Sequence, residues 1–211
     1  FGNDFVVIEC SSLENSPDLL NPILMVLTYQ ISKEIYLEEK NKINHNKKNI
    51  VIMDEAHKFL GKSAHVEIFV EQAYRRFRKH GASMLLGTQG FEDLYGGDSV
   101  SKVGRVIIEN SFWNFFLMQR STSREKIKKS GFFNLSPYAY ALMDNTAPAD
   151  GEYGEIFIMT DRVQTKGRVV LDKFLQTLLF TDADLRSKMN VLVSQGMSHL
   201  DAVKHILDTN D

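Results

Sequence analysis

Two adjacent carboxylates, Asp54 and Glu55, stand directly after a short apolar run at residues 49–53. A run of that length with polar flanks is typical of a fully buried strand in a parallel sheet. Acids at the carboxyl end of such a strand occupy the edge where open α/β sheets bind ligands. In the Walker B arrangement of nucleotide hydrolases, the first acid holds Mg²⁺ and the second orients or deprotonates the attacking water. The alternative interpretation is a buried strand that ends in a solvated acidic turn.

A second polar pair, Thr88 and Gln89, ends the next predicted strand, at residues 83–89. Neighbouring strands of a parallel sheet end at the same edge, so Gln89 is predicted to reach the site made by Asp54 and Glu55. A neutral amide there can sense a γ-phosphate or position a water. For Gln89 alone, a capped strand end is the better interpretation. The combination of acid pair, helix and Thr-Gln strand end favours a hydrolase.

Four cations in five residues lie between these two strands: Arg75, Arg76, Arg78 and Lys79. A charge run of this kind usually marks a solvated helix face. The functional alternative is an arginine finger, donated across a subunit boundary to a developing phosphate charge. Arginine suits that role because its planar fork stays charged and binds phosphate through two hydrogen bonds. Arg75 and Arg78 are the first candidates.

The segment Gly61-Lys62-Ser63 copies the end of a phosphate-binding loop, but the glycine that a complete loop needs five positions earlier is Ala56. We interpret this segment as an exposed turn. No other Gly-x-x-x-x-Gly-Lys-Ser/Thr occurs in the sequence. A phosphate loop is therefore expected upstream of Phe1, and we interpret the chain as a piece of a longer protein. His57 completes the Asp-Glu-Ala-His box of superfamily 2 helicases, although a satisfied polar residue at a helix start is the simpler interpretation.

Hydrophobic periodicity predicts the elements that position these residues. Residues 5–9 and 49–53 are both predicted to be buried strands, and a helix between them gives the order that favours a parallel sheet. That helix is predicted to begin with Asn21 as its N-cap and Pro22 in its first turn. A polar, basic surface loop at residues 41–48 follows it. The predicted buried face of the helix contains Ile23, Val26, Leu27, Ile31 and Ile35.

The helix that carries the cations has an apolar stripe and ends at Gly81; the stripe consists of Val66, Phe69, Val70, Ala73 and Phe77. Beyond residue 99 the pattern predicts a helix at 100–110 and then an aromatic strand at 112–119, with Trp113 in the core. Two short helices are predicted next, at 124–130 and 135–143. Paired strands are predicted at 155–160 and 168–171. Three helices close the chain, and the last two have capping-box-like starts at Thr181 and Ser198.

Bulk composition excludes several classes of protein. The formal net charge of −2 does not indicate nucleic acid or an anionic membrane as a partner, although a local basic surface remains compatible with nucleic acid. A single cysteine, Cys10, excludes a disulfide framework and suits a reducing compartment. No apolar run has the length of a membrane span. No histidine and acid cluster has metal-ligand spacing, so any metal is expected to be Mg²⁺ that arrives with nucleotide.

Taken together, these segments resemble the TraC-type ATPases of conjugative type IV secretion systems, in the HerA/FtsK branch of RecA-like motor ATPases. The resemblance rests on segments that occur in the same order, among them Thr88-Gln89-Gly90-Phe91-Glu92-Asp93-Leu94, and covers nearly the whole chain. The other matching segments are residues 5–9, 49–60, 74–81, 108–111, 151–155, 167–172 and 195–198, with Ala202 and Val203.

The resemblance implies an α/β fold: an incomplete RecA-like parallel-sheet P-loop ATPase core at residues 1–172, with a C-terminal helical extension at 173–211. It also implies ATP and Mg²⁺ as cofactors, with Asp54 as the Mg²⁺-associated acid, Glu55 as the catalytic base and Gln89 as the sensor. Thr88 would contact the nucleotide, and Arg75 or Arg78 would be the finger. The implied assembly is a ring, usually a hexamer, at the cytoplasmic side of the bacterial inner membrane, in contact with channel and inner-membrane components.

The sequence is compatible with three functions. The first is the C-terminal part of an ATPase that energises pilus assembly and transfer, in which the 211 residues alone are inactive because they lack the phosphate loop. The second is a HerA-like or DEAH-box translocase, which would hydrolyse ATP in response to nucleic acid. The third is a non-hydrolysing interaction module that docks onto a secretion channel through the final helices and the basic helix face.

Overall fold

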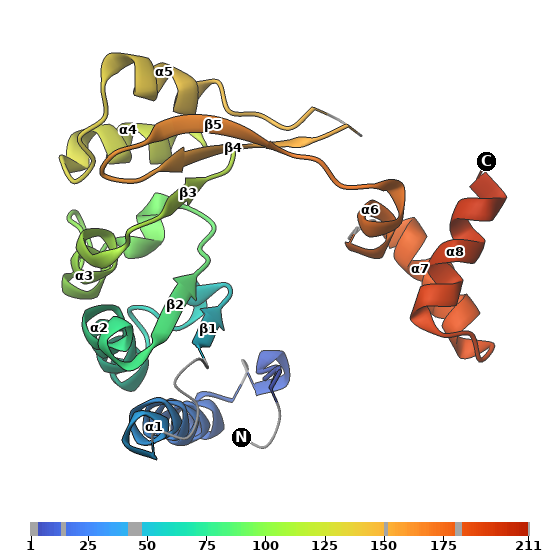
Figure 1. Ribbon diagram of the computed structural model, residues 1–211, viewed down its shortest axis with the longest axis horizontal. Coiled ribbons are helices and arrows are strands. Elements are labelled where there is room, and N and C mark those ends of the chain that lie inside the picture. The colour runs from blue at the N-terminus through green and yellow to red at the C-terminus, as the bar shows by residue number, and fades with distance from the viewer. Residues whose placement is uncertain (1–3, 14–15, 42–47, 150–151, 180–182, 211) are drawn as a thin grey trace.

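Two small sheets organise the chain (Figure 1). The computed structural model describes residues 4–13, 16–41, 48–149, 152–179 and 183–210. In the first sheet, β1 (Asn49–Met53) pairs in parallel with β2 (Ala82–Leu86). The second sheet is antiparallel, with the order β3-β4-β5, and consists of β3 (Asn114–Phe116), β4 (Gly154–Met159) and β5 (Gln164–Val169).

Helices and short 3-10 helices connect and flank these strands. The α-helices are α1 (Pro17–Asn41), α2 (Ala64–Arg76), α3 (Lys102–Asn110), α4 (Ser121–Ser130), α5 (Pro137–Asp144), α6 (Lys173–Leu179), α7 (Ala183–Ser194) and α8 (His199–Asn210). The 3-10 helices are η1 (Ser11–Leu13), η2 (Ala56–Lys58), η3 (Phe77–His80) and η4 (Phe91–Leu94).

The β1–α2–β2 unit is the part of the fold that positions the polar strand ends. The apolar stripe predicted for α2 is buried, with no member more than 4% exposed, and α2 packs against α1, α3 and β2. Gly81 ends the η3 turn after α2 with a φ of 67°, a conformation that costs glycine little. The helix thus returns the chain to the same edge of the sheet, which makes β2 parallel to β1.

The predicted first strand is wrong. Residues 5–9 form no strand, and their side chains are exposed, with Phe5 at 81% and Val7 at 74%. A strand needs a neighbour for its backbone hydrogen bonds, and the only strand paired with β1 in the described residues is β2. The βαβ unit of the chain is therefore β1–α2–β2, and not the unit predicted across α1.

The start of α1 also differs from the prediction. The helix begins at Pro17, so Pro22 lies inside it and Asn21 is not its N-cap. Pro17 is the better start because a proline in the first turn gives up no helical hydrogen bond. The buried face is shifted as well: Ile35 is buried as predicted, whereas Ile23 is 38% exposed. Most of the predicted loop at 41–48 lies outside the described residues.

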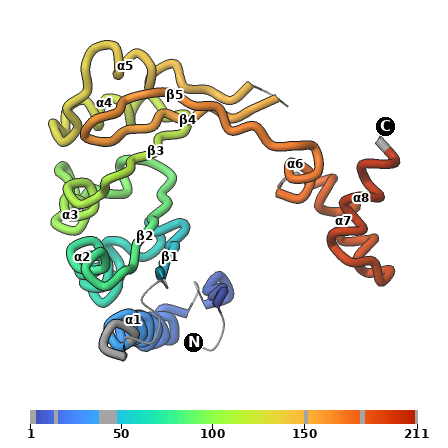
Figure 2. The backbone as a smooth tube through the Cα atoms, in the orientation of Figure 1, coloured from blue at the N-terminus to red at the C-terminus, as the bar shows by residue number. Residues whose placement is uncertain are grey.

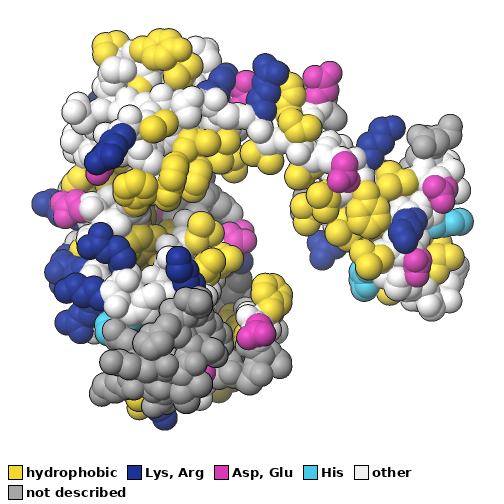
Figure 3. All heavy atoms as spheres, in the orientation of Figure 1, with side chains coloured by type: hydrophobic (Ala, Val, Ile, Leu, Met, Phe, Trp, Pro, Cys, Tyr) yellow, Lys and Arg dark blue, Asp and Glu magenta, His cyan; other side chains and the backbone are white. Residues whose placement is uncertain are grey.

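β1 has one buried face and one open face, which corrects the prediction of a fully buried strand. Val51 and Met53 pack against the core, while Ile50 is 68% and Ile52 is 65% exposed. Leu85 of β2 continues the open face at 50% exposure. Figure 3 shows hydrophobic side chains along this inner side of the curved molecule. The side chains of the apolar run point to both faces of the sheet, and the described part of the chain packs against only one of these faces.

The aromatic strand is shorter than predicted. Of the predicted residues 112–119, only Asn114–Phe116 form a strand, β3, which pairs with β4. Trp113 lies just before β3 with 55% exposure, so the prediction that Trp113 is a core residue is wrong. Its ring stacks on Phe115 with centroids 6.1 Å apart, and Phe115 is also exposed. The core on this side is formed instead by Phe116 with Phe133 and the fully buried Phe157.

The last three helices form a unit of their own at one end of the molecule. Residues 170–172 lead from β5 to α6, and α8 packs on both α6 and α7 (Figures 1 and 2). The Ser198 cap is present, because Ser198 Oγ donates to Asp201 Oδ2 at 2.7 Å and accepts from the Asp201 N–H. Thr181 lies outside the described residues. No described helix has the length and apolar character of a membrane span.

Candidate functional site

The parallel pairing of β1 and β2 brings the acidic turn beside the end of β2. Met53 is in register with Leu86, and the Gly87 N–H donates to the Met53 carbonyl at 2.9 Å. The Ala56 N–H in turn donates to the Gly87 carbonyl at 2.9 Å, so residues on both sides of the acidic pair are bonded to Gly87, the residue that follows β2. A Cβ at Gly87 would lie 3.0 Å from Asp54 Oδ1. Glycine at position 87 therefore leaves room for the Asp54 carboxylate over the strand end.

Glu55 has an unusual backbone conformation at this turn. Its φ of 49° and ψ of 42° place it in the left-handed region, which residues other than glycine rarely adopt, and it is the only such non-glycine residue that the structure describes. The Glu55 N–H donates to Asp54 Oδ1 at 2.9 Å. Strained conformations of this kind persist where the surrounding structure imposes them, and they are frequent at functional sites. The turn sends the Glu55 side chain toward Lys58 and Gln89.

The Glu55 carboxylate has two side-chain partners. Oε2 forms an ion pair with the Lys58 ammonium, and Oε1 accepts a long hydrogen bond of 3.4 Å from Gln89 Nε2. The hydrogen bond and charge of Lys58, followed by the Gln89 bond, hold the pKa of Glu55 below its ordinary value. Glu55 is therefore ionised at neutral pH. A carboxylate of lowered pKa is better suited to orient a water by accepting its hydrogen bond than to act as a strong base.

Gln89 and Thr88 lie in an exposed loop that follows β2. The structure thus places Gln89 in contact with Glu55, as the sequence predicts for two parallel strand ends. Asp93 Oδ2 accepts the backbone N–H groups of Gln89 at 3.0 Å and of Gly90 at 3.1 Å. Thr88 Oγ1 donates to the Gly90 carbonyl at 3.3 Å, a contact within the loop. Sequence patterns had singled out Gln89 but not the carboxylate that fixes its backbone.

The two finger candidates lie away from these acids. Arg75 pairs with Glu71 one helical turn earlier, at 3.3 Å, and Glu71 also pairs with Lys102 of α3 at 3.0 Å. Arg78 lies beyond α2, in η3, and is exposed. Within the described residues, neither arginine forms an ion pair with Asp54 or Glu55. Figure 3 shows lysine and arginine side chains gathered on the outer side of the molecule, over α2 and α3. The structure therefore does not bring these arginines to the acids within one chain.

The Gly61-Lys62-Ser63 segment is a turn, as the sequence predicts. Gly61 is exposed with a φ of 76°, and its N–H donates to Glu67 Oε1 at 2.8 Å. A backbone N–H that would face phosphate in a phosphate loop is thus bonded to a carboxylate of the chain itself. Ser63 caps α2 from a buried position, but its Oγ has no hydrogen-bond partner in the part of the chain that the structure describes. This arrangement does not favour an anion at the Gly61 N–H, because a carboxylate already accepts from it.

His57 departs from the prediction of a satisfied polar residue. Its Nδ1 atom is buried, and no hydrogen-bond partner for it lies within the described residues. The described residues also contain no group of three or more acids, histidines and cysteines arranged to hold a metal. A single carboxylate such as Asp54 nevertheless fits Mg²⁺, because that ion keeps several waters and takes most other oxygens from nucleotide phosphates. The exposed position of Asp54 at the strand end is compatible with such a ligand set.

Three further residues shape the site and were missed at the level of sequence: Lys58, Gly87 and Asp93. Lys58 stands three residues after Glu55 in a turn, a spacing that brings a cation beside an acid, so this signal was present. The role of Gly87 depends on the strand register, which is a tertiary property. Asp93 stands three residues after Gly90, and its carboxylate accepts the Gly90 N–H; an acid at this position of a helical turn was a readable local signal, although glycine has no side chain to complete a capping box.

Comparison with known proteins adds the family. The TraG P-loop domain family matches residues 1–205. The chain is 30% identical to Protein TraC of Escherichia coli (strain K12) over 115 residues, which is 54% of this chain and 12% of TraC. The solved structure of VirB4 of Thermoanaerobacter pseudethanolicus superimposes with a TM-score of 0.56 at 18% identity and covers 81% of this chain and 42% of that one. The chain thus spans less than half the length of either relative.

The likeness to VirB4 confirms the fold class, a mixed α/β structure with a parallel strand pair in a RecA-like core and helices after it. At 18% identity this likeness concerns the fold alone. The match to the family, in contrast, extends over nearly all of the 211 residues. The chain therefore belongs to the TraG P-loop domain family, and its resemblance to conjugative type IV secretion ATPases is confirmed.

Proposed function

We propose that this chain is the C-terminal part of a motor ATPase that energises conjugative type IV secretion by ATP hydrolysis. The observation that carries the proposal is the contact between Gln89 and Glu55, because it joins two parallel strand ends into one polar site. Family membership supports the reaction class. The sequence contains no Gly-x-x-x-x-Gly-Lys-Ser/Thr motif, and we assign hydrolysis to a longer protein and expect the 211 residues alone to be inactive.

Each polar residue at the carboxyl ends of β1 and β2 has a role in this proposal. Asp54 holds Mg²⁺ through its carboxylate, and Glu55 accepts a hydrogen bond from the attacking water and orients it. Gln89 senses the γ-phosphate with its amide and restrains the Glu55 carboxylate. Thr88 contacts the nucleotide from the same loop. Bound ATP and Mg²⁺ supply the transferable phosphoryl group and neutralise its charge.

The second part of the proposal concerns the arginine finger, the ring assembly and the location of the protein in the cell. Arg75 or Arg78 acts on the nucleotide of a neighbouring subunit, which agrees with their distance from the acids of their own chain. The protein assembles as a ring, of which a hexamer is the expected size. It lies at the cytoplasmic side of the bacterial inner membrane and contacts channel and inner-membrane components. Residues 1–172 belong to the ATPase core, and residues 173–211 are the helical extension.

The test is the substitution Glu55→Gln in the full-length protein. The amide keeps the size of the side chain but removes its charge, so kcat for ATP hydrolysis is expected to fall by about 100-fold or more. Nucleotide affinity should stay within about twofold, because Glu55 is not proposed to bind the phosphates. Steady-state hydrolysis and equilibrium binding of a fluorescent nucleotide measure the two effects.

Glu125→Gln is the matched control, since Glu125 also pairs with a lysine, Lys129, but lies on the exposed surface of α4. This variant is expected to keep the turnover of the natural protein. Turnover by Glu55→Gln equal to that of the control would contradict the role proposed for Glu55.

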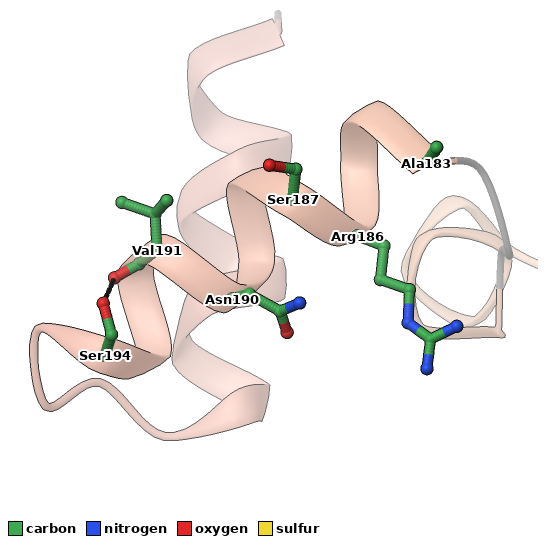
Figure 4. A pocket seen from close by; sticks show the side chains of 6 residues that line it. All are labelled: Ala183, Arg186, Ser187, Asn190, Val191 and Ser194. Carbon is green, nitrogen blue, oxygen red and sulfur yellow. Dashed lines mark hydrogen bonds between the residues drawn. The ribbon is translucent and has the colours of Figure 1, made fainter.

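A non-hydrolysing interaction module is the second candidate, and one observation favours it. The α6–α8 unit lies apart from the sheets, and α7 presents a shallow, solvent-open surface formed by Ala183, Arg186, Ser187, Asn190, Val191 and Ser194 (Figure 4). Capture of secretion components by residues 1–211 without nucleotide would support this candidate for the chain, whereas the ATPase proposal concerns the longer protein. For a HerA-like translocase the compatible feature is the basic surface over α2 and α3 (Figure 3), and hydrolysis that does not respond to nucleic acid would contradict it.

A further inference from the structure

We infer that Asp93 is a positioning residue for Gln89 and that η4 is the support on which this positioning depends. The inference rests on the proposed function, because Gln89 matters only if it acts on nucleotide or water beside Glu55. Asp93 itself contacts neither Asp54 nor Glu55 in the described residues. Its role is to hold the backbone from which Gln89 extends.

The loop that carries Gln89 has few other restraints. β2 ends at Leu86, so the ladder of strand hydrogen bonds stops before Gln89, and the Gln89 side chain is exposed. The Asp93 carboxylate replaces the ladder by accepting two consecutive N–H groups, those of Gln89 and Gly90. The Asp93 N–H returns a bond to the Gly90 carbonyl at 3.2 Å. These bonds close the turn on both sides of Gly90.

The η4 turn, which carries Asp93, is held by contacts with two helices. Toward α3, the Leu94 carbonyl accepts the Ser101 N–H at 2.9 Å, and a Cβ at Gly104 would lie only 2.2 Å from that carbonyl oxygen. Toward α4, Ser123 Oγ donates to Glu92 Oε2 at 2.5 Å, and Ser123 is only 2% exposed. The η4 turn is therefore fixed between two helices.

Positioning matters here because the contact that it controls is long. Gln89 Nε2 and Glu55 Oε1 are 3.4 Å apart, near the limit of a hydrogen bond, so a small shift of the loop backbone breaks the contact. Misplacing a catalytic group by about 1 Å can lower a rate by about 100-fold. Loss of the Asp93 carboxylate should thus act on catalysis through Gln89.

The experiment compares Asp93→Ala, Asp93→Asn, Gln89→Ala and the double variant in the full-length protein. Asp93→Ala is expected to lower kcat by about 10- to 100-fold with KM changed by less than about threefold. Asp93→Asn keeps an acceptor oxygen and is expected to recover most of the loss. Because Asp93 acts through Gln89, the double variant should be no slower than Gln89→Ala alone.

Asp172→Ala is the matched control, because the Asp172 carboxylate also accepts a backbone N–H, that of Leu175 at 2.8 Å, but caps α6. It is expected to leave kcat unchanged, and thermal denaturation of all variants reports any general loss of stability. Losses in kcat that multiply in the double variant would overturn the inference, as would Asp93→Ala activity equal to the control. If Gln89→Ala is slow and Asp93→Ala is not, the inference fails while the proposed function stands. If Gln89→Ala retains full kcat, the proposed function itself loses its sensor, so the two failures are distinguishable.

Discussion

At the scale of single residues, the site depends on the charge state of Glu55. Lys58 is its ion-pair partner and the main cause of its lowered pKa. A carboxyl group of lowered pKa contributes stabilisation to the fold that is fully present above its ordinary pKa; the contribution is lost as the pH falls through the lowered value. Lys58 therefore extends the pH range in which Glu55 is ionised toward lower pH.

Lys58→Met in the full-length protein is expected to narrow that range. Without the ammonium, the pKa of Glu55 rises toward its ordinary value, so the acid side of the kcat profile should move to higher pH. Hydrolysis rates measured from roughly pH 4 to 7 test this shift, since an unperturbed glutamate titrates near the lower end of that range. Lys62→Met, a nearby exposed lysine in the Gly61 turn, should leave the profile in place. An unshifted profile in Lys58→Met would show that another group sets the acid limb.

At the scale of elements, the joint between η4 and α3 is a close contact of backbone atoms. The Leu94 carbonyl lies where a side chain on Gly104 would begin, at 2.2 Å. A backbone group cannot move aside as a side-chain tip can, so one methyl group at position 104 must displace the helix or the turn.

Gly104→Ala is therefore expected to destabilise the fold by about 1–3 kcal/mol, the usual cost of overpacking, although alanine favours a helix more than glycine does. Chemical denaturation of the purified protein measures the change. Gly154→Ala is the matched control, because a Cβ at Gly154 meets nothing within 4 Å. Equal stabilities for the two variants would mean that α3 and η4 adjust without strain.

Elements with strong local signals were predictable, and elements that depend on distant partners were not. The stripe of α2, the glycine at its end and the polar ends of β1 and β2 were read from spacing alone, as was the meeting of Gln89 with the acidic turn. The strand at residues 5–9 failed because apolar side chains do not supply the neighbouring strand that it needs.

The candidate site was predictable in its residue types and not in its restraints. Sequence patterns located the acids, but the left-handed backbone of Glu55 and the space above Gly87 follow from strand register and turn geometry. The Trp113 prediction failed for a related reason, since aromatic residues are usually buried and this one lies on an open side of the molecule. Burial is a property of the whole arrangement, which a local pattern does not contain.

At the scale of the whole molecule, the open face of the β1–β2 sheet is an exposed apolar surface beside the site. Ile50, Ile52 and Leu85 project from it with half or more of their surface in water. Contiguous exposed apolar surface of this kind promotes association. The chain as an isolated 211-residue protein is thus expected to bind a hydrophobic dye and to self-associate.

Ile50→Thr combined with Ile52→Thr should reduce both effects in the isolated chain. Threonine keeps the β-branched shape that strands favour, so the melting temperature should change little. Dye fluorescence and sedimentation velocity are the measurements. Val51→Thr, on the packed face of the same strand, should instead lower the melting temperature and leave the dye signal unreduced. Unchanged self-association of the double variant would show that another surface of the chain mediates it.

The backbone of Glu55 also bears on how this protein would respond to selection for heat resistance. Glycine adopts its left-handed conformation at no steric cost, so exchange of Glu55 for glycine is a direct route to a more stable fold. That exchange would remove the carboxylate that faces Lys58 and Gln89. Stability and the proposed chemistry therefore compete at one position, and a screen for thermostable variants that ignores activity would be expected to discard the carboxylate proposed to orient the attacking water.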